Sequence, residues 1–129
     1  VCEEYLDFWS REFGLEYAAL RLANVYGPRQ NPHGEAGVVA IFCQRSLKAE
    51  QCTIYGTGEQ TRDFVYVKNV ADAARRVIAD RVTGAFNIGT GRETTVTELY
   101  KMIAAAAGNP HPAHYAEGKP GEQLRSVID

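Results

Sequence analysis

The sequence predicts an α/β fold, because apolar segments typical of strands alternate with amphipathic segments typical of helices along its 129 residues. Residues 17–22 (YAALRL) are mostly apolar, which indicates a strand buried on both faces of a parallel sheet. Hydrophobic residues make up 45% of the chain and charged residues 23%, a balance that excludes a disordered, collagen-like or coiled-coil protein. At this length we expect one compact domain or part of one.

The first predicted element is a helix at residues 1–13, which Gly14 ends, and the strand at 17–22 follows it. Residues 23–37 show no periodicity and contain three glycines and two prolines, so we expect a long functional or disordered loop there. The helix is predicted from apolar side chains at helical spacing: Cys2, Tyr5, Leu6, Trp9 and Phe13.

The alternation continues through the rest of the chain. We expect helices at 38–49 and 70–78 and strands at 53–55, 64–67 and 85–88. Asn69 is expected to cap the second of these helices. Thr95 and Glu98 have the spacing of a capping box, so a further helix begins there, runs to about residue 107 and ends at Gly108. We expect one more short strand near residues 114–116.

Charge and cysteine content narrow the class of protein. The formal net charge is −2, from 14 basic and 16 acidic residues, so no nucleic-acid partner is expected. No apolar stretch reaches the roughly 18 residues of a membrane span, and no secretion leader is visible. Three cysteines without a CxxC pair predict buried thiols in a reducing compartment, so we expect a cytoplasmic protein. The three histidines lack metal-site spacing, and we expect no metal.

The residues alone show no self-contained catalytic group. The Gly-Thr-Gly turns at 56–58 and 89–91 lack the third glycine of a dinucleotide motif, so we interpret them as tight turns. Arg62 lies beside the predicted strand 64–67 and is suited either to gripping a phosphate or to a surface pair with Asp63. Asn24 follows a buried strand, where it is suited either to a ligand crevice or to capping its own turn.

Five segments, taken together in order, resemble the NAD-dependent epimerase/dehydratase family, the extended short-chain dehydrogenases that act on nucleotide sugars. Within that family the resemblance is strongest to members that epimerise UDP-sugars at C4, chiefly through GEAGVVAIF. The matching segments are LRLANVYGPRQ (20–30), HGEAGVVAIF (33–42), IYGTGEQTRDFVYV (54–67), FNIGTG (86–91) and PGEQLRSVID (120–129).

The resemblance implies an architecture: the C-terminal part of a Rossmann-like enzyme, mainly its small mixed α/β substrate-binding domain. Residues 1–30 would be the end of the Rossmann-like domain, and residues 31–129 would bind the sugar nucleotide. The family's glycine-rich NAD motif, and its Tyr-x-x-x-Lys pair on a long helix, are not recognised here, and the chain is expected to begin just after that pair. We therefore expect NAD in the full-length enzyme, no NAD bound by this chain alone and no activity alone.

The resemblance also implies roles for particular residues. Leu22 and Val25 would approach the nicotinamide of NAD. Lys119 stands where an Arg is common, and Ser126 where some epimerases have a Tyr. The residues that would bind the UDP-sugar are Asn24 and Arg62 at the phosphates, Val38 in the pocket wall, Thr53 and Tyr55 beside the uracil, and Glu122 at the ribose hydroxyls.

Two other functions compete with this reading. One is another nucleotide-sugar enzyme, a 4,6-dehydratase or a decarboxylase, and the other is a non-catalytic module that binds a nucleotide or a protein partner. The apolar stripe of the helix at 1–13, or other exposed apolar surface, also predicts self-association as a homodimer.

Overall fold

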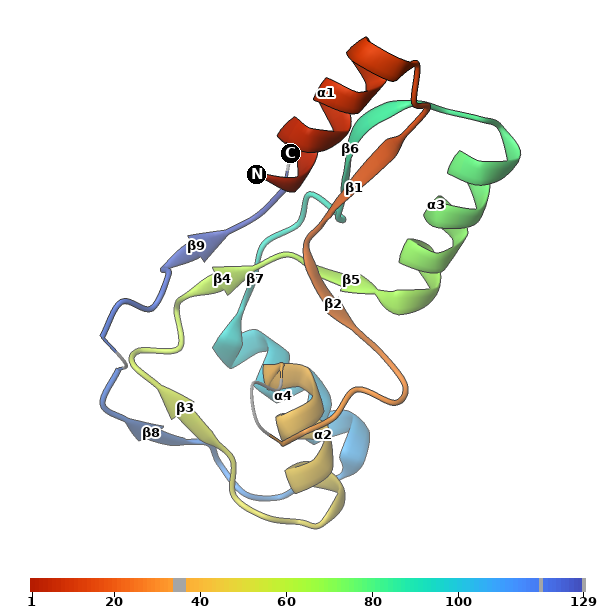
Figure 1. Cartoon of the computed structure of the whole chain (residues 1–129). Coiled ribbons are helices and arrows are strands. Elements are labelled where there is room, and N and C mark those ends of the chain that lie inside the picture. The colour runs from red at the N-terminus through yellow and green to blue at the C-terminus, as the bar shows by residue number, and fades with distance from the viewer. Residues whose placement is uncertain (34–36, 119, 129) are drawn as a thin grey trace.

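A computed structural model describes residues 1–33, 37–118 and 120–128. The Gly-Glu-Ala part of the HGEAGVVAIF motif and Lys119 lie outside these residues. The predicted alternation of strands and helices is confirmed, and Figure 1 shows the elements gathered around two groups, one containing both termini and one below it.

The first group is built on a parallel pair of strands. β1 (Ala18–Leu22) pairs with β6 (Gly84–Ile88), with Leu20 opposite Phe86. In Figure 1, α1 (Cys2–Phe13) lies on one side of this pair and α3 (Val67–Ala79) on the other. The guanidinium of Arg21 on β1 binds the Glu3 carboxylate, which ties α1 to the strand.

The second group contains the hydrophobic core. The helices α2 (Val38–Leu47) and α4 (Val96–Ala107) pack together beside a parallel pair formed by β3 (Thr53–Tyr55) and β8 (His114–Ala116). The Phe42 and Tyr100 rings meet edge to face with centroids 5.5 Å apart, an arrangement that aromatic pairs favour. The buried members of this core are Phe42, Cys52, Ile54, Val96, Leu99, Tyr100 and Ala104.

Short strands lie between the two groups. β2 (Asn24–Tyr26) runs parallel to β5 (Phe64–Tyr66). β4 (Thr61–Arg62) pairs antiparallel with β7 (Thr94–Thr95) and parallel with β9 (Arg125–Ser126). These strands set the positions of Asn24 and Arg62, which belong to different segments of the sequence.

Two predictions about local structure are wrong. Residues 24–26 form β2 and are not loop, because β5 supplies hydrogen-bonding partners that lie 40 residues further along the chain. Asn69 does not cap α3, because the helix begins at Val67 directly after β5, with Tyr66 in the N-cap position. The strand prediction at 64–67 is therefore one residue too long.

The predicted ends of α1 and α4 and the capping box are confirmed, whereas the helix predicted at 38–49 ends at Leu47. Gly14 and Gly108 follow α1 and α4 with φ of 68° and 67°, the left-handed conformation that glycine adopts without steric cost. The Thr95 hydroxyl accepts from the Glu98 amide at 3.1 Å, and the Glu98 carboxylate accepts from the Thr95 amide at 3.0 Å.

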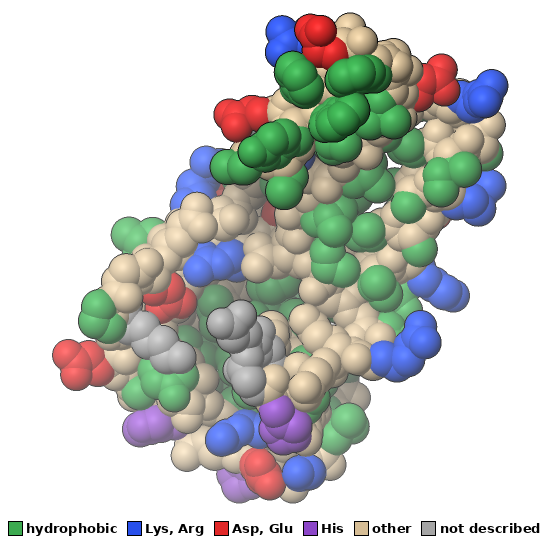
Figure 2. Space-filling view, in the orientation of Figure 1, with side chains coloured by type: hydrophobic (Ala, Val, Ile, Leu, Met, Phe, Trp, Pro, Cys, Tyr) green, Lys and Arg blue, Asp and Glu red, His purple; other side chains and the backbone are tan. Residues whose placement is uncertain are grey.

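The apolar stripe of α1 is largely uncovered. Tyr5 is 64% exposed, Trp9 48% and Phe13 66%, and Figure 2 shows the hydrophobic side chains gathered over this helix. Across the described residues, no helix is both long and apolar enough to cross a membrane.

Candidate nucleotide-binding site

A cavity of about 330 Å³ lies where the start of α2, the strand β3 and the strand β4 meet. Its wall includes all six residues that the sequence assigns to the substrate, drawn from five separate segments of the chain. The lining residues are Asn24, Val38, Ile41, Phe42, Thr53, Ile54, Tyr55, Gln60, Arg62, Val96 and Glu122.

Asn24 reaches the cavity because two strands hold its backbone. The Ala23 amide donates to the Ile88 carbonyl at 3.0 Å, and the Asn24 amide donates to the Asp63 carbonyl at 2.9 Å. These bonds bring the end of β1 next to the β4–β5 junction. Asn24 therefore lies on the same wall as Arg62, although 38 positions separate them in the sequence.

The apolar part of the wall comes from α2 and β3. Val38 is the first residue of α2, and Gly37 before it has the extended φ of −65° and ψ of 143° of an N-cap. In β3, side chains alternate between faces, so Thr53 and Tyr55 share one face. Tyr55 is 44% exposed and lines the cavity.

Arg62 and Glu122 supply opposite charges to the cavity. The Arg62 side chain is only 16% exposed, and its Nη1 donates to the Thr61 carbonyl at 2.8 Å. Its Nη2 lies 3.9 Å from Glu122 Oε1, beyond hydrogen-bond length. A guanidinium has five N–H donors, so Arg62 keeps donors that can bind an anion in the cavity.

Asp63 is fully buried next to Arg62 and anchors the turn at 89–91. Its carboxylate accepts from the Thr90 amide, from the Thr90 hydroxyl at 2.6 Å and from the Gly91 amide at 3.0 Å. Burial by itself would raise the pKa of this carboxyl, but hydrogen bonds from Thr90, Gly91 and the Ile128 backbone outweigh it and lower the pKa. The surface pair between Arg62 and Asp63 that the sequence left open is therefore not formed.

The two residues assigned to NAD do not line the cavity. Leu22 ends β1 and is 46% exposed, and Val25 is half-buried in β2. Their apolar side chains fit contact with a flat ring, but neither carries a polar group for the pyrophosphate of a dinucleotide. Leu22 and Val25 accordingly fit only the nicotinamide end of NAD.

Tyr115 and Lys119 have the Tyr-x-x-x-Lys spacing, which the sequence expectation overlooked. Tyr115 lies in strand β8, where residues four apart do not form a helical pair, and its hydroxyl lies 3.3 Å from Thr97 Oγ1. The spacing therefore does not represent the family's pair on a long helix.

Sequence reasoning missed five lining residues, of which Gln60 is polar. Gln60 is 6% exposed and donates from Nε2 to the Tyr55 carbonyl at 2.8 Å and to Glu122 Oε1 at 3.2 Å. The sequence did contain a signal for Gln60. It lies two residues before Arg62 in an extended segment, where residues two apart point to the same face, so Gln60 could have been expected beside Arg62. The missed residues are Ile41, Phe42, Ile54, Gln60 and Val96.

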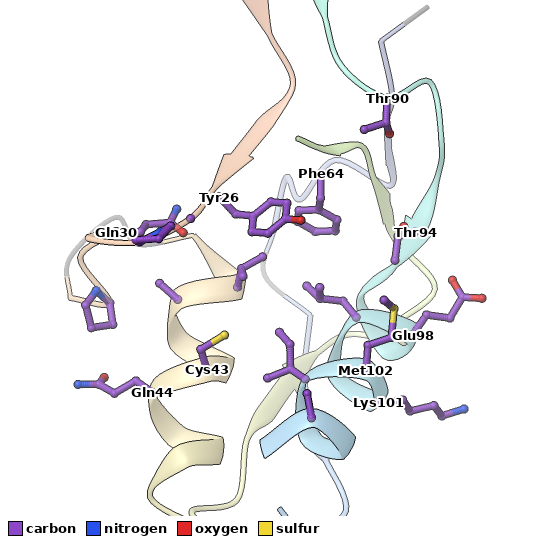
Figure 3. A pocket seen from close by; sticks show the side chains of 18 of the residues that line it. Tyr26, Gln30, Cys43, Gln44, Phe64, Thr90, Thr94, Glu98, Lys101 and Met102 are labelled. Atoms are coloured by element: carbon purple, nitrogen blue, oxygen red, sulfur yellow. The ribbon is translucent and has the colours of Figure 1, made fainter. Parts of the chain in front are cut away.

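A larger groove of about 1120 Å³ lies between α2 and α4 and contains none of the predicted site residues. Figure 3 shows Cys43 of α2 directed toward the space between the two helices, with Met102 of α4 on its far side. Burial raises the pKa of the Cys43 thiol, which keeps it protonated. The smaller cavity is the candidate ligand site, because a cation, an anion and amide groups line it. Among the described residues, no group of three acidic, histidine or cysteine side chains is placed to hold a metal.

Comparisons with known proteins agree with this fold. The model of the NAD dependent epimerase/dehydratase family matches residues 1–89. A protein of Methanocaldococcus jannaschii is 46% identical over 129 residues, 100% of this chain and 42% of its own length. A UDP-glucose 4-epimerase of Mycolicibacterium smegmatis is 43% identical over 98% of this chain and 41% of its own length.

A solved structure from Thermotoga maritima extends the comparison. This UDP-glucose 4-epimerase with UDP-glucose is 47% identical, with a TM-score of 0.89 over 98% of this chain and 41% of its own. The chain thus spans about two fifths of the length of the relatives it matches. The chain belongs to the NAD dependent epimerase/dehydratase family.

Proposed function

We propose that this chain binds the UDP part of a UDP-sugar in the cavity between α2, β3 and β4. The single observation that carries the proposal is that Asn24, Arg62 and Glu122 line the same cavity as the aromatic residue Tyr55. A cation suits a diphosphate, a carboxylate suits neutral hydroxyl donors and an aromatic ring suits a base. The Thermotoga maritima relative, whose structure contains UDP-glucose, also supports the proposal.

Each side chain has a proposed role. Arg62 and Asn24 donate hydrogen bonds to the diphosphate, and Val38 forms the apolar wall. Thr53 and Tyr55 flank the uracil, and Glu122 accepts from the ribose hydroxyls. A charge-assisted hydrogen bond of this kind contributes about 1.5–3 kcal/mol, so Arg62 supplies a large share of the affinity.

We further propose that the chain works within an NAD-dependent UDP-sugar 4-epimerase that interconverts UDP-glucose and UDP-galactose. When bound to the full-length enzyme, NAD would supply reversible hydride transfer at the sugar. Residues 31–129 would hold the nucleotide, and residues 1–30 would belong to the Rossmann-like domain, where Leu22 and Val25 contact the nicotinamide. The chain alone is expected to bind no NAD and to leave the sugar unchanged.

A decarboxylase or dehydratase within the same family is the second candidate, because UDP-glucuronic acid decarboxylase 5 of Arabidopsis thaliana is 35% identical over 80% of this chain. A non-catalytic nucleotide- or partner-binding module is a third candidate.

Two further proposals concern the location of the protein in the cell and its oligomeric state. The free thiols among the described residues support a reducing, cytoplasmic location. The exposed aromatic side chains of α1 support a homodimer, which light scattering at high concentration tests.

Calorimetry of the 129-residue chain with UDP tests the binding proposal. We expect heat of binding with UDP, a weaker signal with UMP and the weakest with uridine, because the phosphates contact Arg62. Arg62→Ala should weaken the binding of UDP, and Arg76→Ala is its matched control. Arg76 lies on α3 and pairs with Asp72 away from the cavity. A folded chain that gives no heat with millimolar UDP contradicts the proposal. Turnover of UDP-galactose by the chain with added NAD contradicts the expected inactivity.

A further inference from the structure

Gln60 is a buried polar residue that joins both ends of the proposed nucleotide site. One N–H of its amide donates to the Tyr55 carbonyl at 2.8 Å, and Nε2 also donates to Glu122 Oε1 at 3.2 Å. The two partners lie on different segments, β3 and the stretch before β9. A single side-chain amide thus links the backbone of β3 at Tyr55 to the Glu122 carboxylate.

The position of Gln60 is itself fixed. Its backbone carbonyl accepts from the Val96 amide at 3.1 Å, which ties it to the start of α4, and its side chain is 6% exposed. A Cβ added at Gly56 would lie 3.9 Å from Gln60 Nε2, an ordinary van der Waals distance, so the turn after β3 lies beside the amide. A side chain held in this way loses little further entropy when a ligand binds.

The bond to Gln60 also affects the charges in the cavity. Glu122 Oε1 lies 3.2 Å from the Gln60 amide and 3.9 Å from Arg62 Nη2, so the closer partner is neutral. A carboxylate released from Gln60 is expected to close on the guanidinium, because bidentate pairs between Arg and a carboxylate are strong. That closure would occupy both charged groups with each other.

We propose that Gln60 is a positioning residue that keeps the Glu122 carboxylate in a loose ion pair with Arg62, at 3.9 Å and so too long for a hydrogen bond. The carboxylate is then left to accept from ribose hydroxyls and the guanidinium to bind the diphosphate. This inference rests on the proposed binding of UDP. It assigns to Gln60 no direct contact with the ligand.

The test compares the affinities of UDP and 2′-deoxy-UDP by calorimetry of the whole 129-residue chain. In the wild type we expect UDP to bind about tenfold more tightly, the effect of one hydrogen bond to a charged group. In Gln60→Met this ratio should fall towards one, because Glu122 is no longer held at the ribose. Gln51→Glu, at an exposed glutamine that bonds the Pro112 carbonyl outside the cavity, should keep the wild-type ratio.

Gln60→Glu provides a second readout that loss of folding would not produce. Two carboxylates at this distance share a proton at mildly acidic pH, so the new side chain can then donate to Glu122 as the amide does. The charged side chains described around it are Glu122 and Arg62, while Glu98 on α4 bonds Thr95 instead. We expect the UDP to 2′-deoxy-UDP ratio to be near one at pH 8 and to recover several-fold at pH 5.5. Both ligands carry the same diphosphate, so its own titration cancels in the ratio.

The outcomes separate the two proposals. A wild-type chain that binds no UDP overturns both. Wild-type binding of UDP together with an unchanged ratio in Gln60→Met, or with no acid recovery in Gln60→Glu, overturns only the role of Gln60 and leaves the nucleotide site standing.

Discussion

The Asp63 carboxylate accepts a hydrogen bond from the Thr90 hydroxyl at 2.6 Å, across 27 positions of the sequence. Asp63 is fully buried, and its carbonyl also accepts from the Asn24 amide at 2.9 Å. One residue therefore connects the turn after β6, the start of β2 and the strand that carries Arg62. The proposed site depends on this connection, because it sets Asn24 beside Arg62.

Asp63→Asn should destabilise the fold by about 1–3 kcal/mol at pH 7, since an amide replaces a charged acceptor of several bonds. The folded-state pKa of Asp63 is lowered, so its contribution is present above the unfolded value of about 3.9 and is lost as pH falls through the folded value. Urea unfolding between pH 2 and pH 7 measures this. The exposed Asp72→Asn serves as the control and should change stability less. Equal losses in the two variants would contradict the role of Asp63.

Gly89→Ala should also destabilise the fold, by about 1–3 kcal/mol, because an added Cβ would lie 2.4 Å from Asp63 Oδ2 and force the buried carboxylate to move. Gly118→Ala is the comparison, since its nearest contact would be an ordinary 3.4 Å. Thermal unfolding of the two variants gives the difference. A Gly89→Ala protein as stable as the wild type would show that the turn relaxes without cost.

Arg62→Ala should weaken the binding of UDP about 10- to 100-fold, with a much smaller effect on uridine, because the lost donors face the diphosphate. Arg62→Lys should recover part of the loss, since an ammonium is a point charge without the planar fork. Calorimetry with both ligands measures the difference, and Arg76→Ala on α3 is the control. Equal weakening of UDP and uridine would rule out the pyrophosphate role of Arg62.

The three cysteines should react with a thiol reagent at three different rates at pH 8. Cys2 is exposed and should react first. Cys43 should react slowly, because burial raises the pKa of its thiol and leaves little thiolate. Cys52 has no exposed surface and should react only when the chain unfolds. Stopped-flow absorbance with single Cys→Ser variants assigns each phase, and a fast reaction of Cys43 would contradict the raised pKa of its thiol.

The sequence predicts those helices and strands whose pattern involves only residues that are close together in the chain. The helix α1 follows from its apolar spacing, and α4 follows from Thr95 and Glu98, because a capping box involves residues only three apart. The strands β4, β7 and β9 have two residues each, too few for a periodic pattern, and β2 lies at the start of a segment without periodicity. Their pairing partners lie far away in the sequence, so only the folded chain defines them.

The sequence by itself determined the fold class, the family and the six residues that now share one cavity wall, because the family's motifs are contiguous and can be recognised in one dimension. Only the tertiary structure decided that Gln60 binds Glu122 and that Asp63 is buried beneath the turn at 89–91. A glutamine or an aspartate gives no sequence signal of its partner when the partner is distant. The three-dimensional packing of separate strands creates those hydrogen bonds, and the charges of the proposed site are arranged by them.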